Sequence, residues 1–432
     1  MTRRLIDFFF IYMIFEVIVR KLFLKEYSVE IKIFRDLIPG LTYAIYFLGR
    51  YRYSDIRWPD SLIGISLTLY IATGIMQFFN PESWGPLVGL LGLRTHFAYL
   101  PLLILAPAYI RTRDQLIRRL VCLCIIVVPV VIVGLIQNRL PASDPLNANS
   151  DAVFGDAGLV RASGTFSYIT GYGVLCQFVL VAAMALLVLK PIRSRAGLIA
   201  VVGAVFAFVG CLSSGSRAPV VGSALQLGVF CTMLVWSRAG GRTASVLKIA
   251  ILGAVVGAVA IMQAPDVYEA FRQRAMAAAF DVTGRLDSGI FGWWSVLAEY
   301  PLGMGIGMAH QQAGTLVGRT AGFLSGYESE LSRIAYELGI PGFVAMAVFR
   351  LSLLSRIGFG ARALTDPARA VVAALSFSTI ALMLTGGVYT PMGNALLYLT
   401  AGLGLAAVNA KAAVLLQRPQ RRALRRQPYP VG

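Results

Sequence analysis

The amino-acid sequence predicts an all-α fold: a polytopic integral membrane protein with about twelve transmembrane helices. Hydrophobic residues make up 57% of the 432 residues and charged residues only 14%, whereas soluble globular proteins carry about 25% charged residues. Long apolar runs recur along the whole chain, without the repeated strand-like alternation that a barrel requires. Because backbone groups in lipid must be hydrogen-bonded internally, we expect these runs to be helices.

The expected spans divide the chain into four regions. Residues 1–262 hold nine helices and residues 340–416 hold three, with a long loop between them at 263–339 and a basic tail at 417–432. Within the loop we expect short helices at 266–280, 287–299 and 327–338, the last of which ends at Gly339 before Pro341. The twelve apolar runs lie at 5–19, 37–49, 61–79, 97–110, 120–136, 172–189, 196–212, 218–236, 244–262, 340–354, 370–388 and 393–416.

The distribution of Lys and Arg predicts the orientation in the membrane. Of the 39 Lys and Arg residues, 25 fall in segments on the side of the termini and 14 on the other side. The positive-inside rule therefore places both termini in the cytoplasm and the long loop outside. Five of the 14 lie between the first two spans, which is an exception to the pattern. The net charge of +18 thus reflects membrane topology, and we expect no nucleic acid partner.

The first candidate site is the segment from Ser213 to Pro219, between the seventh and eighth spans. Ser216 is expected to cap the following helix and Pro219 to lie in its first turn. Arg217 adds a guanidinium group to the free N–H groups of that helix start, which favours a phosphate. The alternative interpretation is an arginine that anchors a helix end at the membrane interface.

Two further arginines lie in external segments. Arg285 precedes an aromatic-rich helix that contains Trp293 and Trp294, whose rings are suited to the headgroup zone or to sugar faces. A surface ion pair between Arg285 and Asp287 is the alternative. Arg161 precedes the sixth span, and its alternative role is that of a solvated interfacial arginine.

Carboxylates and histidines of the long loop supply candidates for proton transfer. On a helix, Glu330, Arg333 and Glu337 share one face and favour a structural row of ion pairs, which leaves Glu328 as the candidate base. A solvated glutamate at a helix start is the alternative for Glu328. His310 is a second candidate base. No histidine has metal-ligand spacing, so we expect no metal, and the glycines at 303, 305 and 307 predict a flexible turn.

Together, the order of these motifs resembles the O-antigen ligase and O-antigen polymerase superfamily of membrane glycosyltransferases. The resemblance covers most of the chain and includes the layout of twelve spans with a long loop between the ninth and tenth. The motifs that carry it are Arg161 to Phe166, Gly215-Ser216-Arg217, Gly284-Arg285, Tyr300 to Gly307 and Tyr336 to Gly342.

The resemblance implies a multi-pass enzyme of the bacterial inner membrane that transfers glycan from undecaprenyl diphosphate to an acceptor hydroxyl in the periplasm. It implies no cofactor and no required metal, and diphosphate binding by Arg217 and Arg285 with help from Arg161. Expected partners are the lipid-linked oligosaccharide, membrane lipids, a chain-length regulator and a flippase.

The chain departs from the family pattern at one position. Ligases of this family carry a histidine where this chain has Glu328. The departure favours a polysaccharide polymerase. The alternative is a ligase that transfers glycan to lipid A core or another acceptor, and a polysaccharide transporter is the third hypothesis.

Overall fold

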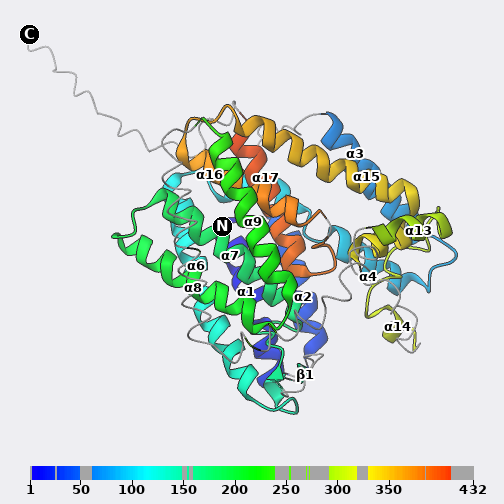
Figure 1. Ribbon diagram of the computed structural model, residues 1–432. Coiled ribbons are helices and arrows are strands. Elements are labelled where there is room, and N and C mark those ends of the chain that lie inside the picture. The colour runs from blue at the N-terminus through cyan, green and yellow to red at the C-terminus, as the bar shows by residue number, and fades with distance from the viewer. Residues whose placement is uncertain are drawn as a thin grey trace, which may run out of the picture.

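The computed structural model confirms a helical membrane protein, apart from one pair of two-residue strands (Figure 1). It describes residues 2–24, 27–48, 61–147, 153–154, 159–238, 253, 269, 272, 291–318, 329–384 and 386–409. The first half comprises α1 (Thr2–Leu22), α2 (Ser28–Leu48), α3 (Ser61–Phe78), α4 (Pro86–Phe97), α5 (Pro101–Tyr109), α6 (Arg113–Arg139), the 3₁₀ turn η2 (Pro145–Asn147), β1 (Val153–Phe154) and β2 (Leu159–Val160). The second half comprises α7 (Ile169–Leu189), α8 (Arg195–Ser213), α9 (Arg217–Trp236), α13 (Gly292–Glu299), α14 (Ala313–Leu316), α15 (Glu330–Ala361), α16 (Pro367–Leu382) and α17 (Pro391–Val408).

Eight stretches of the described chain are long and apolar enough to cross a membrane. They are α3, the joined α4 and α5, α6, α7, α8, α9, α15 and α17. The first two predicted spans form α1 and α2, but charged side chains such as Asp7, Glu16 and Arg35 keep these helices out of that set. The eleventh, α16, is shorter, with 16 residues, and the predicted ninth span at 244–262 lies outside the described residues except for position 253. The total of twelve stays a prediction.

The core of the bundle is built around α7. Of its membrane-spanning window, 83% is buried, because α6, α8, α9, α16 and α17 pack around it. Its 21 residues contain no charged side chain, as expected for a helix buried on every side. A second group of elements, α3, α4, α13 and α15, lies to one side of these helices, with α3 beside α15 (Figure 1).

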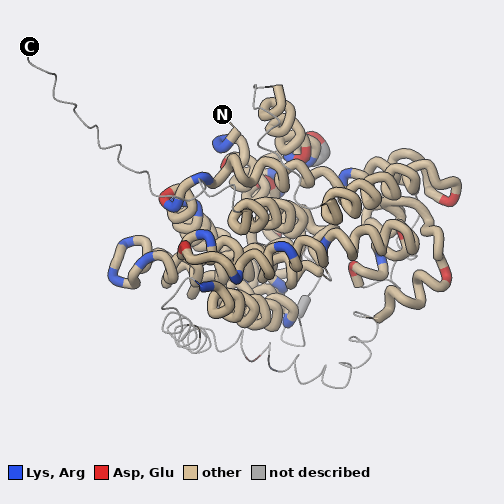
Figure 2. The backbone as a smooth tube through the Cα atoms, turned by 90° about the horizontal axis from the view of Figure 1, so that it is seen from above, with Lys and Arg blue, Asp and Glu red and all other residues tan. Residues whose placement is uncertain are grey.

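The two ends of the bundle are fixed by side chains that reach between helices. Arg3 Nε donates a hydrogen bond to the carbonyl oxygen of Ala108, and Arg113 Nη2 donates one to Leu189. We call this the N-terminal end. At the other end of α1, Arg20 Nη2 donates a hydrogen bond to Ser167 Oγ. We call this the opposite end. Figure 2 shows Lys and Arg gathered near the ends of helices, with few Asp and Glu.

A kink divides α15 where the sequence predicted a helix end. Gly339 has φ 61° and ψ −167°, outside the helical region, and Pro341 follows it. The N–H of Ile340 donates instead to the carbonyl oxygen of Pro301, at 2.8 Å. The predicted end of the short helix at Gly339 is therefore confirmed, and the freed backbone group binds the turn at 301–307.

Arg350 is one of the basic residues counted on the side of the termini, although it falls within the apolar run at 340–354, and the structure shows it buried. The helix α15 continues to Ala361, and Arg350 is only 2% exposed. Its Nη1 donates hydrogen bonds to the carbonyl oxygens of Met383 and Leu384, at 2.7 and 3.0 Å. Because α16 ends inside the bundle, its unsatisfied carbonyl groups need a buried cation as a partner.

The fold predicts opposite effects for two helical glycines. In α4, a methyl group added at Gly92 would lie 2.3 Å from the backbone nitrogen of Gly307, whereas at Gly64 in α3 it would meet nothing within 4 Å. We expect Gly92→Ala to lower the free energy of unfolding by about 1–3 kcal/mol through overpacking. Gly64→Ala should be neutral or stabilising by up to about 1 kcal/mol. Thermal unfolding in detergent measures both, and equal melting temperatures would contradict the close packing of α4 on the 301–307 turn.

Candidate functional site

A cavity of about 640 Å³ lies at the opposite end of the bundle. Its walls come from α1, α2, α4, the segment before α7, residues 310–312, the start of α15 and the start of α17. Six basic side chains line it against two carboxylates, Glu16 and Glu330. We call it the cationic cavity. Its basic residues are Arg20, Lys32, Arg35, Arg94, Arg161 and Arg333.

The cationic cavity explains the exception in the charge distribution. Arg20, Lys32 and Arg35 belong to the five basic residues between the first two predicted spans. In the structure these three side chains face the cavity instead of marking a topological side. Ionisable groups within membrane helices are costly and mark functional sites by default. These three cavity residues could therefore have been recognised in the sequence, because they depart from the positive-inside rule.

Acidic residues hold two of the guanidinium groups in place. Arg35 forms ion pairs with Glu16 and Asp36, and Arg94 pairs with the second oxygen of Asp36. The Tyr99 hydroxyl donates a hydrogen bond to Asp36, at 2.7 Å. A guanidinium group carries five N–H donors, so such a pair fixes its orientation while other donors serve a ligand. The arginines are thus positioned before any anion binds.

The segment that carries Arg161 is clamped by the amide of Gln137. The oxygen of this amide accepts hydrogen bonds from the N–H groups of Ser163 and Gly164, at 3.0 and 2.8 Å, and its nitrogen donates to the Gly164 carbonyl oxygen. Gly164 has φ 55°, which favours glycine. The sequence-predicted Arg161 therefore lies in the wall of the cationic cavity on a rigid loop.

The candidate segment from Ser213 to Pro219 adjoins the loop that carries Arg161. The Ala162 N–H donates to the carbonyl oxygen of Ser213, so the segment before α9 touches the Arg161 loop. Pro219 lies in the first turn of α9, as predicted, but Arg217 is not among the residues that line the cavity. Ser216 occupies the predicted N-cap position of α9, but its side chain makes no capping hydrogen bond. The hydroxyl oxygen of Ser214 accepts a hydrogen bond from the Ser216 N–H, at 3.3 Å.

Trp294, a further candidate from the sequence, is not among the residues that line the cavity. Trp294 on α13 is 70% exposed, while its neighbour Trp293 stacks on Phe343, with ring centroids 4.9 Å apart. Arg285 and Glu328 lie outside the described residues. Their roles stay predictions.

The predicted row of ion pairs along Glu330, Arg333 and Glu337 is wrong. Glu330 lines the cavity, and its carboxylate accepts hydrogen bonds from the N–H groups of Gly387 and Val388. Glu337 is fully buried and does not line the cavity. Its carboxylate binds His96 and the Ala309 N–H, so partners from other segments, which the helical pattern does not reveal, take the place of the expected ion pairs.

Glu337 ends a buried chain of hydrogen bonds. The Tyr70 hydroxyl binds His96 Nδ1 at 2.6 Å, His96 Nε2 binds Glu337 Oε2 at 2.8 Å, and Glu337 Oε1 accepts from the Ala309 N–H at 2.9 Å. His96 and Glu337 are 0% exposed. The chain joins α3, α4 and α15 to the backbone immediately before His310.

His310 lies in the cavity wall as a neutral imidazole. Burial lowers its pKa to about 4, against the effect of the Glu337 carboxylate, and Arg94 and Arg333 lower it further. Its Nδ1 accepts a hydrogen bond from the Gln312 N–H at 3.1 Å, so the ring proton is on Nε2. His310 is therefore arranged as a hydrogen-bond donor at neutral pH.

The glycine-rich turn is packed instead of flexible, contrary to the prediction. Gly303, Gly305 and Gly307 have φ angles of 81°, 107° and 92°. A side chain at Gly307 would approach the Val88 carbonyl oxygen to 2.0 Å. The turn thus serves close approach to α4, and the prediction that it binds no nucleotide is left untested. Within the described ranges, no group of three or more His, Cys, Asp and Glu residues is arranged to hold a metal ion.

Fold and site together define a polytopic helical membrane protein with a preorganised cationic cavity at one end of the bundle. Residues 202–347 match the family model described as O-antigen ligase. This segment contains Gly215-Ser216-Arg217, the 301–307 turn and Gly339, so the match supports the O-antigen ligase and polymerase superfamily for this chain. The match agrees with the resemblance over this segment, which does not include the motif from Arg161 to Phe166. No curated protein matches the chain.

The buried chain of hydrogen bonds from Tyr70 to Ala309 predicts a structural role for Glu337. Replacement by Ala removes the acceptor for both His96 and the Ala309 N–H, and a buried donor without a partner costs about 1–3 kcal/mol. We expect Glu337→Ala to lower the melting temperature of the purified protein, and Glu337→Gln, which keeps an acceptor oxygen, to lower it less. Equal melting temperatures of the Ala variant and the wild type would contradict a stabilising role of these hydrogen bonds.

Proposed function

We propose that the chain is a polysaccharide polymerase. In this proposal it transfers a glycan from undecaprenyl diphosphate onto a lipid-linked repeat unit at the periplasmic face of the bacterial inner membrane. The observation that carries the proposal is the cationic cavity, which gathers six basic side chains from different segments of the chain. The family match supports it, because this superfamily includes O-antigen ligases and polymerases.

A diphosphate is the ligand whose charge this cavity fits. Guanidinium groups bind phosphate oxygens in a bidentate manner, and five of the six basic side chains are arginines. Glu16, Glu330 and Asp36, which pairs with Arg35 and Arg94 from behind the wall, leave a net positive charge on the six basic side chains, so an anion of high charge is favoured there. The volume of about 640 Å³ also leaves room for the sugars that adjoin the diphosphate.

The proposed reaction is a substitution at the anomeric carbon of the donor glycan. The oxygen of the acceptor hydroxyl forms a bond to this carbon, while the bond from the carbon to the phosphate oxygen breaks. Undecaprenyl diphosphate leaves with the electron pair, and the arginines stabilise the charge that develops on it. The same cations serve in place of a metal ion, so we propose that none is required.

The hydroxyl proton needs an acceptor in the site. The sequence favours Glu328 for this role. Among the described residues, Glu16 and Glu330 are the carboxylates that line the cavity, and Glu16 is held in an ion pair with Arg35. Since His310 carries its proton on Nε2, we assign it as a donor to the substrate and Glu330 as an alternative base.

The alternative function is a ligase that uses the same donor. Both reactions need the same diphosphate site and differ only in the acceptor. The glutamate at position 328, where ligases carry histidine, favours the polymerase. A polysaccharide transporter is the least favoured function, because the buried Arg350 satisfies the carbonyl groups of a helix end instead of lining a path. A chain-length regulator and a flippase remain proposed partners.

The proposal predicts that Arg161→Gln abolishes most of the polymerisation. Loss of a preorganised donor to developing charge typically costs about 10²- to 10³-fold in turnover. We would incubate purified protein with its lipid-linked repeat unit alone and separate the glycans on a gel. The wild type should give a ladder of lengthening products, and the Arg161→Gln and Arg285→Ala variants should not.

Arg139→Gln is the matched control, because Arg139 is an exposed arginine at the same end of the bundle that does not line the cavity. It should retain the ladder. A ladder of normal strength from Arg161→Gln would refute the diphosphate role of the cavity. Transfer that appears only after addition of lipid A core would identify a ligase.

A further inference from the structure

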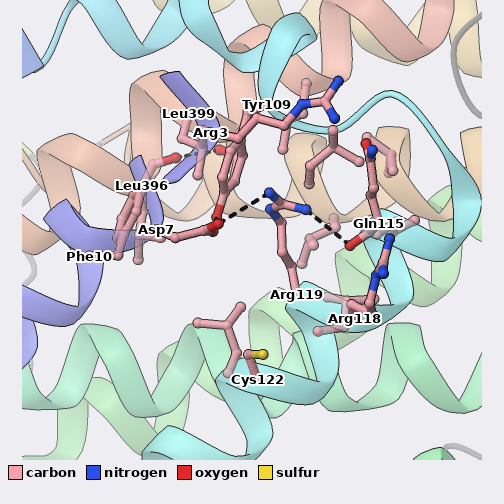
Figure 3. Close-up of a pocket in the computed structure, with 18 of the residues that line it drawn as sticks. Arg3, Asp7, Phe10, Tyr109, Gln115, Arg118, Arg119, Cys122, Leu396 and Leu399 are labelled. Atoms are coloured by element: carbon pink, nitrogen blue, oxygen red, sulfur yellow. Dashed lines mark hydrogen bonds and ion pairs between the residues drawn. The ribbon is translucent and has the colours of Figure 1, made fainter. Parts of the chain in front are cut away.

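A second, larger cavity of about 920 Å³ lies at the N-terminal end of the bundle, between α1, α5, α6 and α17 (Figure 3). We call it the N-terminal cavity. Along α1, Arg3 in this cavity and Arg20 in the cationic cavity are separated by about 25 Å. The two cavities share no lining residue, so the proposed glycan transfer does not account for the second one.

The mouth of the N-terminal cavity is strongly basic. Five arginines line it, and Asp7 is the single carboxylate among its lining residues. Asp7 accepts a hydrogen bond from the Tyr109 hydroxyl and forms an ion pair with Arg119, which also lies over the Tyr109 ring (Figure 3). The five arginines are Arg3, Arg4, Arg111, Arg118 and Arg119.

Three of these arginines are available to a ligand. Arg4, Arg111 and Arg118 are exposed, and none of the ion pairs found in the described part of the chain involves their guanidinium groups. In Figure 3 the Arg118 side chain points away from the pair of Asp7 and Arg119. At the mouth, Asp7 therefore neutralises Arg119, and the other arginines leave a net positive charge.

Most of the other side chains that line the cavity are apolar. Ile14, Leu396, Leu399 and Leu403 line the interior of the cavity. Ile11 and Ile125 also line it, and they are 46% and 52% exposed on the surface of the bundle. The cavity thus borders the surface that the surrounding lipid contacts, and an acyl chain can enter from the side.

We propose that the N-terminal cavity binds an anionic phospholipid, with its phosphate among the arginines and an acyl chain against the apolar wall. Basic pockets between transmembrane helices are typical binding sites for anionic headgroups. A free phosphate would leave the apolar wall without a partner, and a zwitterionic lipid would leave the surplus positive charge uncompensated. The bound lipid bridges the start of α1, the α5–α6 connection and α17.

The test measures lipid binding to purified, delipidated protein by native mass spectrometry. The probes are palmitoyl-oleoyl phosphatidylglycerol, phosphatidylcholine with the same acyl chains, and glycerol phosphate as the soluble headgroup. We expect phosphatidylglycerol to bind at least about tenfold more tightly than phosphatidylcholine, and Arg111→Gln/Arg118→Gln to remove about tenfold of this affinity. The Ile11→Trp variant, which fills the lateral opening, should weaken binding without changing the charge.

Arg193→Gln/Arg195→Gln is the matched control, since both arginines are exposed, lie near Leu189 in sequence and do not line the cavity. It should bind phosphatidylglycerol as the wild type does. Equal loss in this control would reduce the effect to general surface charge and overturn the proposal. Equal binding of phosphatidylcholine, full affinity in Arg111→Gln/Arg118→Gln, or equally tight binding of glycerol phosphate would overturn it as well.

Discussion

The buried carboxylate of Glu337 is the contact on which the arrangement of the site depends. It joins His96 and Tyr70, on α4 and α3, to the Ala309 N–H, and it does so without exposure to solvent. Two residues later the chain breaks its helix at Gly339 and binds the turn at 301–307. One carboxylate and one glycine therefore fix the segment that carries His310, which lies in the wall of the cationic cavity.

The cationic cavity gathers charged side chains from helices of a membrane protein, where ionisable groups are energetically costly. Arg20, Lys32 and Arg35 lie on the two helices whose charged residues weaken their hydropathy. Asp36 and Glu16 orient two of the guanidinium groups without neutralising the cavity. Such a preorganised surplus of donors suits an anion that arrives bound to a lipid and leaves with more charge than it brought. The basic mouth of the N-terminal cavity uses the same chemistry at the other end.

Much of this was predictable from the sequence. Apolar runs predicted the helical membrane fold, Gly339 and Pro341 predicted the break in α15, and the candidate Arg161 lies in the wall of the cationic cavity. Pairwise helix packing was not predictable: it decides that Glu330 faces the cavity while Glu337 faces His96, although both share a helix face. The end of α16 inside the bundle likewise decides that Arg350 is buried. The basic residues of α1 and α2 were visible only as an exception to a topological rule.

The most direct test of the account is an experimental structure of the protein with a polyprenyl diphosphate bound. The account predicts density for the diphosphate in the cationic cavity, within hydrogen-bond distance of Arg161 and of at least one of Arg20, Arg35 and Arg94. Diphosphate density elsewhere on the bundle, with the cationic cavity free of the ligand, would contradict it.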